Sequence, residues 1–147
     1  MISMISTKGR YALRLMIDIA AYSNGLPITL KDISKRQDIS IKYLEQVVSM
    51  LVKRGFLISV RGNAGGYLLA KKPSEYTAGD IIRCCEGTLA PVACLQTDCN
   101  SCPRSDVCST IEFWNGFYDV VNNYVDSVTL EDLRNREFIK IGNDYSI

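Results

Sequence analysis

The sequence predicts a mainly α-helical chain with one small β-hairpin, and three observations support this. Apolar residues recur at helical spacing in successive segments, two short apolar runs flank a glycine-rich stretch, and a long helical pattern follows later. The chain has 147 residues and 47% hydrophobic content, enough for one core or for a small domain with an appendage. We expect a domain over residues 4–72, a second segment over 73–134 and a C-terminal tail over 135–147.

The first half of the chain contains three expected helices. The first runs from about Thr7 to Tyr22, and its expected apolar face comprises Leu13, Met16, Ile17, Ala20 and Ala21. A short second helix follows Thr29 and turns Leu30 and Ile33 inward. Ser40 can cap a third helix, which reaches about Arg54 before Gly55 ends it. The expected buried stripe of the third helix comprises Ile41, Leu44, Val48 and Leu51.

Two short strands follow the third helix. Residues 56–60 and 67–70 are expected to pair across a glycine-rich tip that carries Arg61 at its base. Two helices, a turn or loop, a third helix and a two-stranded hairpin make the element order of a winged helix-turn-helix domain. We expect this domain over residues 4–72.

The second half begins where Pro73 interrupts the pattern. Thr77 and Asp80 predict the capped start of a short helix that runs to about Glu86. The longest helix is expected from about 109 to 128, with an apolar seam of Ile111, Trp114, Tyr118, Val121, Val125 and Val128. Few other elements remain to cover this seam, so we expect a dimerisation helix and prefer it to a core-facing one. Residues 129–133 could add one helical turn before a polar tail.

The charges divide sharply between the two halves. Residues 1–72 hold 12 Lys and Arg against 4 Asp and Glu, whereas residues 73–147 hold 5 against 12. The basic half would be attracted to phosphate. On the third helix, Lys42 and Tyr43 suit phosphate oxygens, while Gln46 can pair with adenine and Glu45 with cytosine. The expected DNA contacts are therefore Ser40, Lys42, Tyr43, Glu45, Gln46 and Arg61, with an ordinary solvated face as the alternative.

Six cysteines lie in the second half. Cys85 is expected in the core and Cys84 to be incidental, because buried cysteine behaves as a small hydrophobe. The other four are Cys94, Cys99, Cys102 and Cys108, spaced C-x4-C-x2-C-x5-C. Four thiols within so short a loop can converge on one metal centre, and soft sulfur ligands favour an iron–sulfur cluster or zinc. Redox-active thiols, or no special role, are the alternatives.

Several segments together resemble the Rrf2 family of bacterial transcription regulators. They are residues 5–14 (ISTKGRYALR), 40–46 (SIKYLEQ), 60–67 (VRGNAGGY), 78–82 (AGDII) and 129–133 (TLEDL), and the match covers about residues 4–134. The resemblance implies a homodimer joined through the long helix, a palindromic operator on double-stranded DNA, and a sequence-reading role for Glu45. It also implies that three cysteines hold an iron–sulfur cluster, with Cys94, Cys102 and Cys108 at the matching positions.

The sequence departs from this family at the fourth cluster ligand. One branch uses a histidine three residues after the third cysteine, where this chain has Ile111, and the chain contains no histidine. Another branch uses an aspartate of the first helix, where this chain has Arg10. Cys99 is the natural candidate for the fourth ligand. Spacing does not distinguish a [2Fe–2S] from a [4Fe–4S] cluster.

The chain ends in Asp-Tyr-Ser-Ile, and this ending resembles the isoleucine-ended tails that insert into the active site of cysteine synthase. A free carboxylate behind a small apolar side chain can mimic an amino-acid substrate. Tyr145 and Ile147 are therefore candidate contacts, and control by cysteine supply is an alternative to cluster sensing. A disordered tail is the simpler interpretation.

The remaining observations bear on class and location. No histidine is available for base catalysis and no nucleotide-binding glycine loop follows a strand, so the sequence does not indicate an enzyme; a pure interaction scaffold is harder to exclude. No run of about 18 apolar residues could span a membrane, and no secretory signal opens the chain, so we expect a cytoplasmic protein. Translation could begin at Met1 or Met4.

Overall fold

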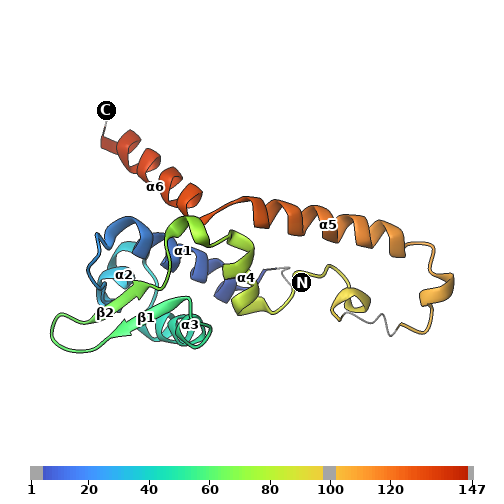
Figure 1. Cartoon of the computed structure of the whole chain (residues 1–147), viewed down its shortest axis with the longest axis horizontal. Helices are drawn as coiled ribbons and strands as arrows, with labels where there is room; N and C mark the ends of the chain where they lie inside the picture. The colour runs from blue at the N-terminus through green and yellow to red at the C-terminus, as the bar shows by residue number, and fades with distance from the viewer. Residues whose placement is uncertain (1–4, 98–101, 146–147) are drawn as a thin grey trace.

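The computed structural model describes residues 5–97 and 102–145, with side chains described up to residue 143. The helices and strands are α1 (Thr7–Tyr22), α2 (Leu30–Gln37), α3 (Ile41–Lys53), β1 (Leu57–Val60), β2 (Gly66–Leu69), α4 (Ala78–Glu86), α5 (Ile111–Ser127) and α6 (Leu130–Tyr145). Three short 3-10 turns are η1 (Pro73–Glu75), η2 (Ala93–Leu95) and η3 (Ser105–Val107). Figure 1 shows a body made of α1–α4 and the hairpin, from which α5 extends. The expected mainly helical winged-helix architecture is confirmed.

Helix α1 lies at the centre of the body, in contact with α2, α3, α4, α6 and β2. Its fully buried apolar residues are Ala12, Leu15, Met16 and Ile19. The expected face was therefore rotated from the real one, because Leu13, Ile17 and Ala20 are only half-buried. A helix surrounded by neighbours on several sides buries a broader face than a single stripe predicts.

The helix-turn-helix follows from local capping. The Thr29 hydroxyl accepts a hydrogen bond from the Asp32 amide at 3.2 Å, and the Ser40 hydroxyl accepts one from the Tyr43 amide at 3.2 Å. Asp38 between the helices adopts a left-handed conformation, with φ of 54°. On α3, Leu44, Val47, Val48 and Leu51 are buried. Ile41, expected in that stripe, is instead exposed because it is the first residue of the helix, beyond the edge of the core.

The hairpin is attached to the body through a short bridge that the sequence did not indicate. β1 and β2 pair in antiparallel register, Leu57 with Leu69 and Val60 with Gly66. Tyr67 and Ile28 also exchange two backbone hydrogen bonds, of 2.8 and 3.0 Å. Gly66 has a φ of 151°, and a Cβ there would lie 2.5 Å from the Ile28 carbonyl oxygen. Only glycine permits this close approach.

Helix α4 packs against α1, and Glu86 near its end contacts the residues with which α1 begins. The Glu86 carboxylate accepts hydrogen bonds from the Ser6 amide at 2.8 Å and from the Ser6 hydroxyl at 2.5 Å. Gly9 lies against the same carboxylate, and a Cβ there would come within 2.6 Å of Glu86 Oε1. Ser6 and Gly9 thus let the two helices approach closely.

The starts of α4 and α6 lie side by side and use the same capping device. Thr77 and Asp80 form a reciprocal capping box, and Thr129 and Asp132 form another, with bonds of 2.9 to 3.1 Å. Thr77 and Thr129 face each other across an antiparallel bridge, which the Ala78 amide extends by donating to the Val128 carbonyl at 2.8 Å. The C-terminal end of α5 is therefore joined to the N-terminal end of α4.

A salt bridge adds a second attachment for α5. The Arg83 guanidinium donates to both oxygens of Asp126, at 2.7 and 3.0 Å, and to Asn122 at 2.7 Å. Gly79 lies beneath this pair, where a Cβ would clash with Asp126 and with Val125. The hydrogen bonds from Arg83 lower the pKa of Asp126.

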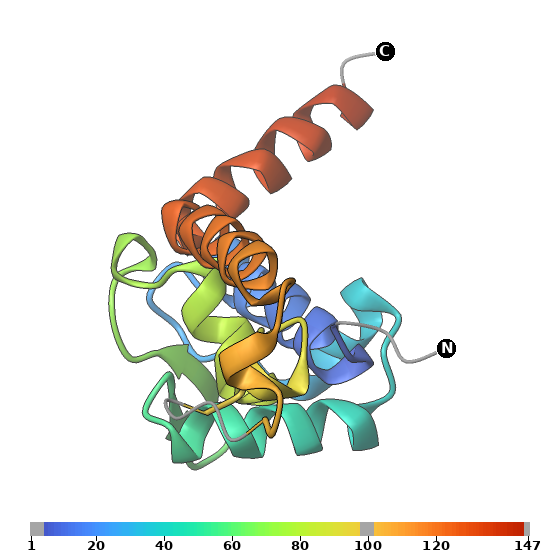
Figure 2. The same ribbon diagram turned by 90° about the vertical axis from the view of Figure 1, so that its right-hand side faces the viewer.

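The C-terminal segment differs from expectation. We expected at most one helical turn over 129–133 and a polar tail over 135–147, but α6 continues to Tyr145. Half-buried Leu133, Glu137 and Ile141 recur at helical spacing after buried Leu130, and α6 contacts α1 and η1. The charged residues between them hid this pattern. Figure 2 shows α6 rising from the body on the side opposite α3. Ile147 lies outside the described residues.

Candidate nucleic-acid interface and cysteine loop

The outer face of α3 carries most of the side chains expected to contact DNA. Lys42, Glu45 and Gln46 are exposed, as is the capping residue Ser40. Tyr43 is half-buried, because its ring packs edge-on against Tyr11 of α1, with 5.1 Å between ring centroids. This contact holds α3 at a defined angle to α1 and leaves the polar side chains facing outward.

A buried carboxylate joins α1 to α2 and was not anticipated. Asp18 is fully buried, and it accepts two hydrogen bonds from Arg36, at 2.7 and 2.9 Å, and one from Gln37 at 2.9 Å. Hydrogen bonding to Asp18 raises the pKa of Arg36, whose guanidinium also lies 4.5 Å from the centre of the Tyr22 ring. Asp18 falls within an apolar run, and this alone could have flagged it, because carboxylates are buried only when paired.

The hairpin forms one wall of a cleft beside α3. A cavity of about 350 Å³ separates them, lined on one side by Glu45, Ser49 and Lys53 and on the other by Ser59 and Tyr67. Arg61 is exposed at the base of the hairpin tip. Ser59, Lys53 and Tyr67 were not among the expected contacts, because only the pairing of the strands brings the wing beside α3.

The cysteine-rich loop lies along α5, away from the body (Figure 1). Cys94 lies in η2, while Cys102 and Cys108 flank η3, and all three are half-buried. Over residues 5–97 and 102–143, no three His, Cys, Asp or Glu side chains lie close enough to hold a metal ion. The structure thus does not bring Cys94, Cys102 and Cys108 together, and Cys99 lies outside the described residues. A hydrogen bond with the Thr110 hydroxyl lowers the pKa of Cys108.

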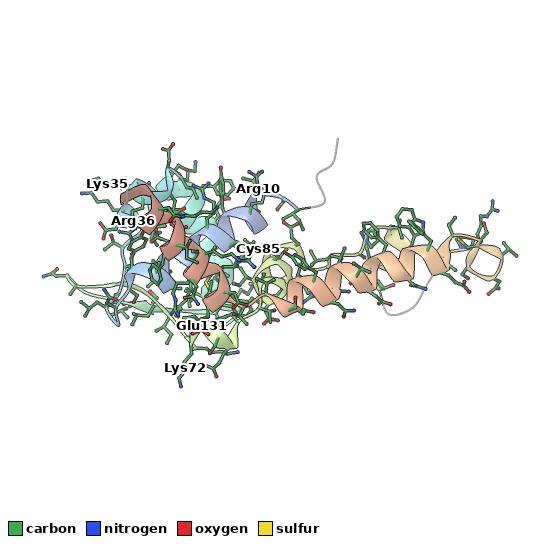
Figure 3. All side chains as sticks on the ribbon, turned by 90° about the horizontal axis from the view of Figure 1, so that it is seen from above. Arg10, Lys35, Arg36, Lys72, Cys85 and Glu131 are labelled. Atoms are coloured by element: carbon green, nitrogen blue, oxygen red, sulfur yellow. The ribbon has the colours of Figure 1, made fainter. Side chains whose placement is uncertain are left out.

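The burial of the two adjacent cysteines of α4 is the reverse of what the sequence predicted. Cys84 is buried in the core, and its thiol lies 3.8 Å from the Met50 carbonyl oxygen. Cys85, labelled in Figure 3, is only half-buried at the edge of that core. Burial raises the pKa of both thiols, that of Cys85 to about 11. Cys84 faces α3, so it belongs to the same face as Ile81.

Helix α5 presents an apolar stripe that is offset from the expected seam. Phe113, Phe117, Val120 and Tyr124 are exposed, and part of this stripe lines a shallow apolar hollow of about 470 Å³. The expected seam residues from Ile111 to Val125 are half-buried, and Val128 is buried. The chain itself supplies their cover, since α4 packs on α5 and Thr88 lies 3.1 Å from the Tyr118 hydroxyl.

The helix-turn-helix with an exposed third helix, followed by a hairpin wing, defines a winged-helix DNA-binding protein. In the described part of the chain, no helix is both long and apolar enough to cross a membrane. The sequence model of the Rrf2 family, described as an iron-dependent transcriptional regulator, matches residues 5–136. The chain belongs to this family.

Individual relatives agree with this assignment. The transcriptional regulator IscR of Pectobacterium atrosepticum is 37% identical over 140 residues, which are 95% of this chain and 84% of the relative. The regulator CymR of Bacillus subtilis is 44% identical over 129 residues, 88% of each chain. The solved structure of CymR, the global cysteine regulator of B. subtilis, superimposes with a TM-score of 0.75 at 40% identity, covering 92% and 98% of the two chains. The protein is a transcriptional regulator of this type and not an enzyme.

Proposed function

We propose that the protein binds a palindromic operator in double-stranded DNA as a homodimer. The exposed outer face of α3 beside the wing carries this proposal. Lys42 and Tyr43 would contact phosphates, whereas Glu45 and Gln46 would contact base edges in the major groove. Ser40 would lie at the phosphate backbone where α3 begins, and Arg61 would reach a narrow minor groove.

The dimer would form through the exposed stripe of α5. Four large apolar side chains at alternating four- and three-residue spacing, Phe113, Phe117, Val120 and Tyr124, are costly to leave in water. A second copy presents the same stripe, so an α5–α5 contact is self-complementary under a two-fold axis. The same axis would set the symmetry of the operator.

DNA selection followed by fluorescence anisotropy tests the DNA-reading face. An operator is first selected from a randomised duplex pool, and variants are then titrated against it. We expect Gln46→Ala to weaken operator binding about 5- to 150-fold with little effect on random DNA. Lys42→Ala should weaken both and lower the salt slope by about one. Lys140→Ala, an exposed cation on α6, serves as the control. Binding of operator and random DNA with equal affinity would contradict the proposal.

The cysteine loop is the proposed sensor. Cys94, Cys102 and Cys108 would hold an iron–sulfur cluster of the [2Fe–2S] or [4Fe–4S] type, with Cys99 as the fourth ligand; zinc is the alternative metal. The donor chemistry fits, because three half-buried thiols lie within one loop beside α5. A bound cluster would make the loop responsive to oxidants, nitric oxide or iron shortage. These thiols would have to approach one another, which would change the loop next to the dimer helix.

Anaerobic purification tests the sensor. We expect coloured protein with bound iron and acid-labile sulfide, and a loss of both in Cys94→Ser, Cys102→Ser and Cys108→Ser. Cys99→Ser should reduce cluster occupancy if it is the fourth ligand. Cys85→Ser, outside the loop, is the matched control. Colourless protein without iron would contradict the cluster, and stoichiometric zinc in its place would support the alternative.

A second candidate function is control by cysteine supply, which the similarity to the B. subtilis cysteine regulator favours. The C-terminal carboxylate of Ile147, with Tyr145 nearby, would enter the active site of cysteine synthase. Calorimetry with cysteine synthase tests this. Binding by the full chain that is lost on deletion of Ile147 supports the candidate, and equal heats for both chains, or none, contradict it.

A further inference from the structure

Arg14, on the exposed side of α1, reaches the turn that joins α2 to α3. Its guanidinium donates one hydrogen bond to the backbone carbonyl of Gln37 and another, from Nε, to the side-chain oxygen of Gln37 at 3.2 Å. Gln37 is the last residue of α2, and the last carbonyl groups of a helix lack partners within the helix and carry partial negative charge. Arg14 therefore caps α2 where the chain turns toward α3.

The side chain of Gln37 is held from the opposite direction as well. Its Nε2 donates to the buried carboxylate of Asp18 at 2.9 Å, which leaves its oxygen directed at Arg14. The next residue, Asp38, has a φ of 54°. A residue other than glycine keeps this left-handed conformation only where its surroundings hold it. Side chains of α1 thus fix the path of the turn.

The guanidinium of Arg14 also lies over an aromatic pair that ends at a proposed DNA contact. Its Cζ is 5.4 Å from the centre of the Tyr11 ring. Tyr11 in turn packs edge-on against Tyr43, with 5.1 Å between ring centroids. One side chain therefore contacts both the turn that precedes α3 and the ring that supports Tyr43 in the first turn of α3.

We propose that Arg14 positions α3 for sequence reading without touching DNA itself, an inference that rests on the proposed function. Helix α3 begins at Ile41, directly after the turn, so a change in the path of the turn alters the direction of the whole helix. Glu45 and Gln46 lie farther along α3, and their hydrogen bonds to base edges are directional. Phosphate contacts tolerate a larger displacement, because they depend mainly on charge.

A positioning role and a direct phosphate contact predict different DNA-binding results. A cation that neutralises a phosphate strengthens binding to every duplex, and its loss lowers the salt slope by about one. A positioning residue strengthens binding to the operator and leaves random DNA and the salt slope nearly unchanged. Exposed polar contacts add little to stability, so substitution of Arg14 should leave the chain folded.

Fluorescence anisotropy of the full chain, with the selected operator and with a random duplex at several salt concentrations, tests the inference. We expect Arg14→Met to weaken operator binding about fivefold or more, with less than about a twofold change on random DNA and the same salt slope. Arg14→Lys keeps the charge and a donor for the Gln37 carbonyl, so it should recover part of the operator affinity. Arg10→Met removes an exposed arginine one turn earlier on α1 (labelled in Figure 3) and should leave the ratio of operator to random binding unchanged. Thermal unfolding verifies that each variant is folded.

The contrary results are distinct. An equal loss of affinity for both duplexes with a lower salt slope would identify Arg14 as a phosphate contact and overturn the inference. Unchanged operator binding by folded Arg14→Met, or an Arg14→Met chain that does not fold, would overturn it as well. Wild-type protein that does not distinguish the operator from random DNA contradicts the proposed function. Wild-type protein that selects the operator no better than Arg14→Met does contradicts the positioning role alone.

Discussion

The body and helix α5 differ in how much of their apolar surface the chain itself covers. Within α1, four apolar residues are fully buried, and Asp18 beside them has a complete set of partners. Helix α5 has 17 residues and none is buried. Its attachments are concentrated toward its C-terminal end, where Arg83 and the Thr77–Thr129 bridge hold it, and Thr88 contacts Tyr118 near its middle. The body therefore contains the contacts that stabilise it, whereas α5 leaves an apolar stripe exposed, which the proposed dimer would cover.

The largest expected effect comes from introducing charge into the α5 stripe. Phe117→Asp should convert the dimer into a monomer, because two carboxylates would face each other in an apolar contact. Losing the second half-site contact should weaken operator binding by about 10²- to 10⁴-fold. Light scattering and anisotropy measure the two effects. Asn115→Asp adds the same charge on the opposite face of α5 and should leave the dimer intact; a monomer there would show that the wrong face was chosen.

Truncation of one apolar side chain in each region should give the next largest difference in stability. Leu51→Ala in α3 removes a fully buried side chain and should lower the free energy of unfolding by about 2–5 kcal/mol. Val120→Ala in α5 removes a side chain that is 69% exposed, so it should cost less than about 0.5 kcal/mol in the monomer. Urea unfolding, at protein concentrations too low for dimerisation, measures both costs. Equal costs would mean that α5 packs on the body more than the structure shows.

Two glycine substitutions in different helices test how α5 is attached to the body, with a smaller expected effect on stability. Gly79→Ala should lower the free energy of unfolding by about 1–3 kcal/mol, because its Cβ would displace Asp126 from Arg83. Gly142→Ala, in α6, has no neighbour within 4 Å and should be neutral or stabilising by up to about 1 kcal/mol. Urea denaturation of the two variants measures the difference. A harmless Gly79→Ala would show that α4 and α5 are not closely packed.

The smallest expected effect is a pH dependence of the same attachment. Arg83 lowers the pKa of Asp126, so the pair stabilises the fold above the ordinary aspartate pKa of about 3.9. This stabilisation is lost as the pH falls through the lowered value. Both side chains are partly exposed, which limits the effect to about 1 kcal/mol or less. Urea unfolding between pH 6 and 2.5 should show the wild type and Asp126→Asn converging at low pH.

The elements that were predictable from the sequence are those whose cause is local. Ser40, Thr77 and Gly55 mark helix ends by their own chemistry, and the structure has helix ends at all three. Which face of each helix is buried was less predictable. Cys84 and Cys85 are neighbours on a short helix, and only the position of α3 decides which of them is buried.

Contacts between distant segments were not predictable. The bridge between Ile28 and Tyr67 and the partners of Asp18 depend on how the segments meet in space. The seam of α5 was expected to lack cover, but it is half-buried because α4 and Thr88 lie against it. For the proposed DNA contacts, the exposure of Lys42, Glu45 and Gln46 was predictable from helical spacing, but the wall formed by Ser59 and Tyr67 was not.

The paired capping boxes at Thr77 and Thr129 hold the C-terminal end of α5 against the body more firmly than any contact nearer its other end. With 17 residues, the helix extends about 25 Å from this point. A rigid rod of that length turns by about 5° when its far end moves by about 2 Å. The cysteine loop lies along the rod toward that far end, so a small closure of the loop corresponds to a rotation at the body. In a symmetric pair, opposite rotations of the two rods would alter the spacing of the two α3 helices.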